Sequence, residues 1–194
     1  RFGMTPRTWR SQGWLAAQPF HPSRPDEPGI RYSPIGLRTL PPLGMVVRRY
    51  FGSYEFIGEH WTHFLSALPD VLTRAQGTLY LALIRDDPRV VPLERIRYDC
   101  CVTPPDSDIL DHADVVALLG RQGFFRSELR SGRYASLVHE GEYFDVGMTH
   151  DALYRWSQQG RYTVTTDPSV EVYTEPPPRT LLGWRRFTML YPVE

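Results

Sequence analysis

Hydrophobic and polar residues follow the same pattern twice along this chain. Residues 45–68 (MVVRRYFGSYEFIGEHWTHFLSAL) and 135–156 (ASLVHEGEYFDVGMTHDALYRW) each read as a short apolar strand, a Gly-x-Tyr break and an amphipathic helix. Aligning Tyr54 with Tyr143 gives an offset of 143 − 54 = 89 residues, and the same offset takes Ile57 to Val146. The chain is therefore predicted to contain a duplicated unit.

Two helices are predicted from the spacing of apolar side chains. The first covers about 53–68, with Ser53 as a favourable N-cap. Its inward face, spaced by three and four residues, consists of Tyr54, Ile57, Trp61, Phe64 and Leu68. The second covers about 145–158, and its inward face consists of Tyr143, Val146, His150, Leu153 and either Trp156 or Ser157.

Strands are expected on both sides of each helix. Residues 38–49 form a sheet edge before the first helix, and 78–84 and 96–103 follow it. A hairpin of 124–129 and 134–139, turning at 130–132, precedes the second helix. The remaining strands are 161–166, 170–175 and a closing strand at 184–193, while 104–120 connects the units. The fold class is thus α+β: tandem β-α-β-β repeats with pseudo-two-fold symmetry, forming a mostly antiparallel sheet with helices packed on it.

Composition narrows the class of protein. The 194 residues include 22 basic and 22 acidic side chains, so a formal charge of zero gives no sign of nucleic-acid or membrane binding by the chain as a whole. We find no apolar run near the roughly 18 to 20 residues of a membrane span and no apolar leader at the start. A cytoplasmic protein without membrane partners is expected.

Metal, redox and catalytic chemistry find little support in the sequence. Cys100 and Cys101 are adjacent, so on a strand they point to opposite faces and cannot readily bond to each other; reduced core thiols are expected. His60 and His63 lie three residues apart beside Glu59, but no third ligand follows at a convincing spacing. We predict no metal, no cofactor and no catalytic residues.

The first residues contain a separate signal. In RFGMTPRTWR, Gly3 suits a helix C-cap, and Thr5 with Pro6 suits the start of a new helix. The run resembles the end of the AraC/XylS-type helix-turn-helix module, in which a recognition helix closes on Phe-Gly and Thr-Pro begins the last helix. Residues 1–18 are therefore expected to be the C-terminal remnant of such a module, with the base-reading helix upstream. A surface helix packing through its tryptophans is the alternative.

Prolines then recur at every third position, at Pro19, Pro22, Pro25 and Pro28. Polyproline II has three residues per turn, so this spacing indicates a stiff, extended strut. Residues 19–29 are predicted to be a linker, with a motif for a proline-binding partner as the alternative. Residues 30–194 are then the globular domain.

That domain resembles the GyrI-like effector-binding domain. The matching segments, in the family's order, are RRYFGSYEFIGEHW, DDPRVVPLERIRYDCCV, GRYASLVHEGEYFDV and SVEVY. The resemblance implies a cleft between the two units, where aromatic side chains sandwich a flat and often cationic molecule and a buried carboxylate answers its charge. Cation–aromatic contacts of about 0.5 to 2 kcal/mol each suit such a cleft.

The resemblance also indicates the ligand-binding residues. Tyr54, Trp61 and Tyr143 are the aromatic candidates, and Glu171 in SVEVY is the carboxylate, with Tyr173 on its face of the strand. Aligning the prolines that end the two strands makes Asp99 and Cys101 the equivalents of Glu171 and Tyr173. Many relatives carry a further Glu before the last strand, where this chain has Met189.

The expected function is the sensor domain of a DNA-binding transcriptional regulator. It binds a small-molecule effector and reaches duplex DNA through the upstream helix-turn-helix module; a homodimer is left open. Two alternatives come from the same resemblance. One is a GyrI-like hydrolase of reactive cyclopropane-containing compounds, and the other is a protein-binding module like the gyrase inhibitor.

Overall fold

The computed structural model describes residues 31–159, 162–177 and 184–194. The expected helix-turn-helix remnant (1–18) and linker (19–29) lie outside these residues. The strands are β1 Arg31–Tyr32, β2 Gly36–Leu40, β3 Leu43–Phe51, β4 Leu79–Ile84, β5 Arg97–Thr103, β6 Phe124–Leu129, β7 Gly132–Glu142, β8 Ser169–Tyr173 and β9 Trp184–Val193. The helices are α3 Ile57–Ala67, α4 Asp70–Thr73, α5 Ala113–Leu119 and α6 Val146–Gln159.

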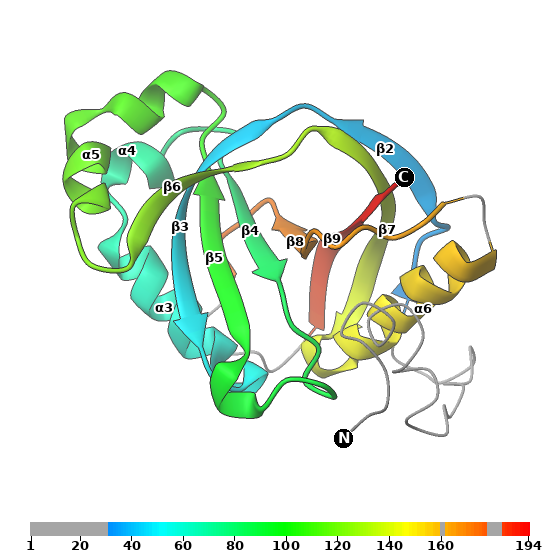
Figure 1. Ribbon diagram of the computed structural model, residues 1–194. Helices are drawn as coiled ribbons and strands as arrows, with labels where there is room; N and C mark the ends of the chain where they lie inside the picture. The colour runs from blue at the N-terminus through cyan, green and yellow to red at the C-terminus, as the bar shows by residue number, and fades with distance from the viewer. Residues whose placement is uncertain (1–30, 160–161, 178–183) are drawn as a thin grey trace.

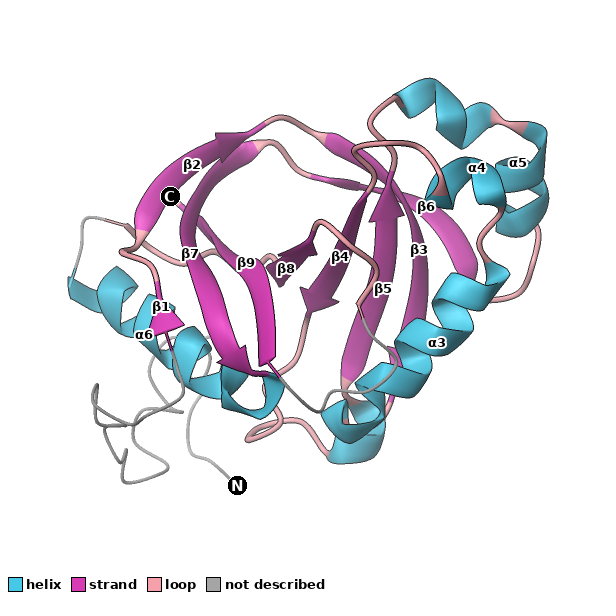
Figure 2. Cartoon of the chain, turned by 180° about the vertical axis from the view of Figure 1, so that it is seen from behind, coloured by secondary structure: helices cyan, strands magenta, loops and turns pink. Residues whose placement is uncertain are grey.

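All the described strands belong to one antiparallel sheet, in the order β1-β7-β9-β8-β4-β5-β3-β6, with β2 also paired to β7. The sheet curls strongly, and α3 and α6 lie outside it, against β3 and β5 on one side and against β7 on the other (Figure 1). Figure 2 shows the same arrangement from behind. The α+β class and the helices expected near 53–68 and 145–158 are confirmed.

The register of the sheet shows the duplication residue by residue. In the first unit β3 pairs with β5 at Tyr50↔Tyr98, and in the second β7 pairs with β9 at His139↔Phe187, which is 89 positions later in both strands. At the centre, β4 pairs with β8. The units are therefore β3-α3-β4-β5 and β7-α6-β8-β9, related by a pseudo-two-fold axis.

This register corrects the strand equivalences expected from the terminal prolines. Glu171 pairs with Ala82 at the centre of the sheet, and these two residues are also 89 apart, so Ala82 and not Asp99 is the counterpart of Glu171. The strand expected at 161–166 is absent from the part that the structure describes, where Val164 forms only an isolated bridge with Val193. A proline can end any strand, so terminal prolines do not identify equivalent strands.

The prediction of a hairpin at 124–139 is also wrong. β6 and β7 do not pair with each other: β6 pairs with β3, starting at Leu43↔Leu129, and β7 pairs with β2, ending at Leu40↔Gly132. Pro41 and Pro42 separate β2 from β3 and have no N–H for a ladder. The connection from β6 to β7 continues opposite this break instead of reversing, and it forms the arch at the top of Figure 1.

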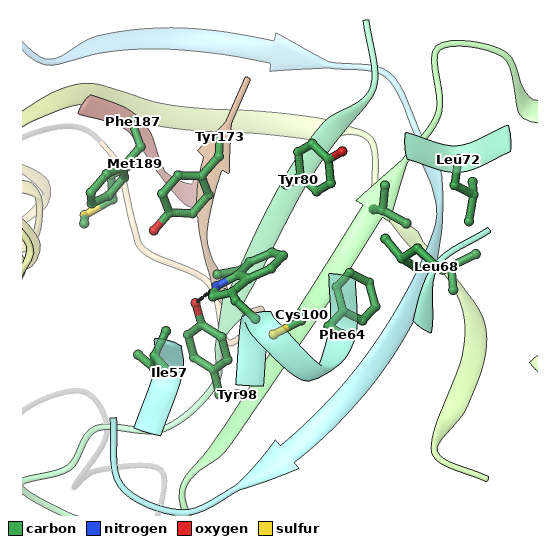
Figure 3. Close-up of a cluster of buried hydrophobic side chains, with 14 of the residues drawn as sticks. Ile57, Phe64, Leu68, Leu72, Tyr80, Tyr98, Cys100, Tyr173, Phe187 and Met189 are labelled. Atoms are coloured by element: carbon green, nitrogen blue, oxygen red, sulfur yellow. Dashed lines mark hydrogen bonds between the residues drawn. The ribbon is translucent and has the colours of Figure 1, made fainter. Parts of the chain in front are cut away.

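Hydrophobic side chains pack on both faces of the sheet. Figure 3 shows the cluster beneath α3, where Phe64 and Leu68 meet strand residues such as Tyr80 and Cys100. Cys101 belongs to the cluster on the opposite face. Both cysteines are buried and free, as predicted. Among the described residues, no helix is long and apolar enough to cross a membrane.

Candidate functional site

The two Gly-x-Tyr breaks place one tyrosine at the start of each of the two helices. Gly52 has φ +132°, which favours glycine, and its N–H donates to the Ile96 carbonyl at 3.0 Å. Ser53 caps the following 3-10 turn by accepting from the N–H of Glu55. Tyr54 opens that turn before α3, and Tyr143 opens the equivalent turn before α6.

A cavity of about 450 Å³ lies between the two repeats. Such a volume falls within the range of roughly 300 to 1,000 Å³ that small-molecule sites occupy. The first repeat contributes Tyr54, Ile57 and the segment 84–89 to its wall. The second contributes Tyr143, Val146, Gly147, His150, Asp151, Ser169, Glu171 and Tyr191.

Glu171 is the most unusual side chain of this wall. It is 1% exposed and accepts hydrogen bonds from the Tyr173 hydroxyl at 2.7 Å and from the Tyr143 hydroxyl at 3.2 and 3.3 Å. No basic side chain forms a salt bridge with it in the described part of the chain. Burial raises the pKa of Glu171 to about 7, and the two tyrosine hydrogen bonds oppose this effect.

The neighbours of Glu171 explain this burial. It lies on a central strand between Ala82 of β4 and Met189 of β9, both completely buried. Neither side chain can solvate a charge. Among the described residues that line the cavity, Glu171 is the one acid that is buried, and its pKa of about 7 lies close to neutral pH.

The other predicted residues take different positions. Tyr54 lines the cavity and donates its hydroxyl to the Asp86 carbonyl at 2.6 Å. Tyr173 contacts the cavity's acid and is otherwise buried. Trp61 is 1% exposed and is not among the cavity's lining residues; its Nε1 donates to the Tyr98 hydroxyl at 2.9 Å, and its ring packs edge-on against Tyr173. Trp61 thus forms a second layer behind the wall.

A family model for the GyrI-like small molecule binding domain matches residues 33–181. The chain belongs to this family. The GyrI-like assignment agrees with the curled sheet and the duplicated units. No curated protein sequence matches the chain significantly.

Solved structures share the GyrI-like fold at low sequence identity. EcmrR in a complex with DNA has a TM-score of 0.61 at 15% identity; the match covers 84% of this chain but 57% of that one, so the present chain spans little more than half of it. SAV2435 bound to tetraphenylphosphonium gives 0.51 at 18% identity, covering 84% and 94%. A hydrolase from Listeria innocua gives 0.57 at 8% identity, covering 82% and 91%. At these identities the likeness shows the fold alone.

The structure adds the segment after β4 to the GyrI-like site, which the sequence indicated only as a turn. Asp86 receives hydrogen bonds from the Arg97 side chain at 2.7 and 2.8 Å, and these hydrogen bonds lower the pKa of Asp86. Asp87 pairs with Arg89 at 2.8 Å, and Arg89 lies 3.7 Å from Asp151. The acids at the rim are therefore neutralised by arginines, whereas Glu171 is not.

A second polar group of the wall was also missed. His150 was predicted on the inward face of its helix, but no ligand role was assigned to it. Its Nδ1 lies 2.6 Å from the Tyr191 hydroxyl of β9. Burial lowers the pKa of His150 to about 4, so the ring is neutral near pH 7. The pairing of a helix residue with a distant strand could not be read from the sequence.

Proposed function

We propose that this GyrI-like domain binds a hydrophobic, cationic and aromatic small molecule in the cavity between its repeats. Glu171 supplies the countercharge, and Tyr54 and Tyr143 supply aromatic surface from the two sides. The observation that carries the proposal is the buried carboxylate of Glu171, which faces a cavity of about 450 Å³ with tyrosine hydroxyls as its partners and no salt bridge to a basic side chain among the described residues.

The energetics favour a cation over a neutral ligand. Ionised Glu171 is unstable in its apolar surroundings, which is why its pKa is raised. A cation in the cavity restores the ionised form by Coulomb attraction, and each tyrosine face adds about 0.5 to 2 kcal/mol. A neutral molecule of the same shape gains neither contribution. The tetraphenylphosphonium bound to SAV2435 supports the choice of a lipophilic aromatic cation as the probe.

We also propose that ligand binding regulates DNA binding by a transcriptional regulator that contains this domain. Support comes from the AraC/XylS-like run at residues 1–10 and from the fold shared with EcmrR, whose structure includes DNA. The 194-residue chain has zero formal charge. By itself it should therefore bind duplex DNA weakly and without sequence preference. A gel shift that showed tight, sequence-selective DNA binding by residues 1–194 would contradict the proposal that this domain binds the ligand and another part of the regulator binds DNA.

Calorimetric titration with tetraphenylphosphonium tests the ligand proposal. Glu171→Gln keeps the shape of the side chain and removes its charge, so the free energy of binding should weaken by at least about 1 kcal/mol. Glu175→Gln, on an exposed residue just beyond β8, is the matched control and should bind as the wild type does. Tetraphenylmethane, the uncharged molecule of the same shape, should bind both proteins alike. Equal affinity of tetraphenylphosphonium for the wild type and Glu171→Gln would remove Glu171 from the site.

A further inference from the structure

The cavity has a polar side that the proposed cation does not use. His150 on α6, Tyr191 on β9 and Ser169 on β8 all line it. His150 Nδ1 is 2.6 Å from the Tyr191 hydroxyl. The second imidazole nitrogen, Nε2, has no hydrogen-bond partner among the described residues. It is also not completely buried.

The state of this nitrogen follows from the bond on the other side of the ring. A neutral imidazole nitrogen is a stronger base than a phenol oxygen, so the Tyr191 hydroxyl donates to Nδ1. The proton of the imidazole then resides on Nε2, which becomes a donor. Asp87, Arg89 and His139 are the charged or titratable groups that act on the ring, but burial dominates and keeps its pKa about 4. His150 therefore offers a neutral N–H donor throughout the physiological range.

The sheet places Tyr191, the partner of His150, near Glu171. β8 and β9 pair at Glu171↔Met189 and Val170↔Leu190, so continuing the register by one residue brings Ser169 beside Tyr191. Ser169 and Glu171 are two residues apart and face the same side of β8. Tyr191, the partner of His150, is therefore placed beside Ser169, two residues along β8 from the buried acid.

The two repeats differ at the helix position that His150 occupies. The offset of 89 residues takes Trp61 of the first repeat to His150 of the second. The Trp61 N–H is used internally, on the Tyr98 hydroxyl behind the cavity wall. In the second repeat, the Tyr191 hydroxyl is bonded to Nδ1 of His150, and Nε2 has no partner among the described residues. The equivalent helix position is thus occupied by a core side chain in the first repeat and by a side chain that lines the cavity in the second.

We propose that His150 Nε2 forms a second, uncharged subsite, which donates a hydrogen bond to an oxygen acceptor of the ligand whose positive centre lies at Glu171. The effector class is therefore an aromatic cation that also carries a carbonyl, ether or similar oxygen. This inference rests on the proposed function, because it places the cationic end of the same ligand at Glu171. Tyr191 is a positioning residue, since it acts by holding the imidazole tautomer.

A matched pair of cations tests the subsite. We suggest (4-acetylphenyl)triphenylphosphonium, which carries a carbonyl oxygen, and (4-isopropylphenyl)triphenylphosphonium, which has the same shape without it. The wild type should bind the acetyl compound about threefold to tenfold more tightly, as expected for one net hydrogen bond. His150→Phe should bring this ratio close to one. Tyr191→Phe should lower it to less than half of the wild-type value and serves as a second variant if His150→Phe does not fold.

Two further variants separate the subsite from the cation site. His63→Phe changes an exposed histidine on α3, so it should keep the wild-type ratio. Glu171→Gln should weaken both cations by a similar factor and leave the ratio unchanged. If Glu171→Gln weakens neither cation, the proposed function fails while the ratio still reports on His150. A wild-type ratio of one, or an unchanged ratio in folded His150→Phe, would overturn the subsite.

Discussion

Replacing Glu171 by Gln should change how the stability of the domain depends on pH. Burial raises the pKa of Glu171 from 4.5 to about 7 in the folded protein. Because the folded state holds this proton more tightly than the unfolded state does, the wild type loses stability as pH rises from about 4.5 through 7. The difference between the two pKa values corresponds to roughly 3 kcal/mol, since one pKa unit is worth about 1.4 kcal/mol. The Gln variant has no such titration.

Urea unfolding of both proteins at several pH values between 4.5 and 8.5 measures this effect. The free energy of unfolding of Glu171→Gln, relative to the wild type, should rise across this range by about 3 kcal/mol and level off above pH 8. Glu175→Gln should show no such rise, because that side chain is exposed. A gap between Glu171→Gln and the wild type that stays constant with pH would refute the claim that burial perturbs this carboxyl group.

Three other properties can be tested on the same protein. Asp99 is completely buried and pairs with Arg49 and Arg85. Asp99→Ala should therefore lower the free energy of unfolding in urea by about 3 kcal/mol, because two arginines lose their partner. A loss below about 1 kcal/mol would argue against the importance of these ion pairs. Trp61→Phe should lower stability by about 1 to 3 kcal/mol, yet affect tetraphenylphosphonium binding less than Tyr143→Phe does, because Trp61 lies behind the wall. Burial raises the pKa of Cys100 and Cys101, so a thiol reagent should modify them only after unfolding, and rapid labelling of the native protein would contradict their burial.

The duplication and the choice of Glu171 could be predicted because both are local patterns. The two Gly-x-Tyr breaks give the offset of 89 residues, and the sheet keeps that offset in every equivalent strand pair. Strand alternation placed Glu171 and Tyr173 on one face, where the structure joins them by a hydrogen bond. These features depend on the period of the chain and on nothing distant in sequence.

The strand equivalences and part of the site depend on long-range pairing. Residues 161–166 have a strand-like composition, yet β8 and β9 already fill the corresponding places in the sheet. The Asp86-Asp87-Pro88 turn gave no sign that its carbonyl would receive the Tyr54 hydroxyl. His150 acquires its role from Tyr191, which lies 41 residues later. A sequence pattern does not specify such meetings between distant elements.

Proton release on ligand binding tests the central claim most directly. Tetraphenylphosphonium can be titrated calorimetrically at pH 7 in two buffers of different ionisation enthalpy. Because the pKa of Glu171 is about 7, about half of the free protein carries this proton, and a cation beside the carboxylate should expel it. We expect about half a proton released per ligand from the wild type and none from Glu171→Gln. Binding to the wild type without proton release, or equal release from both proteins, would contradict the role of Glu171 as the countercharge.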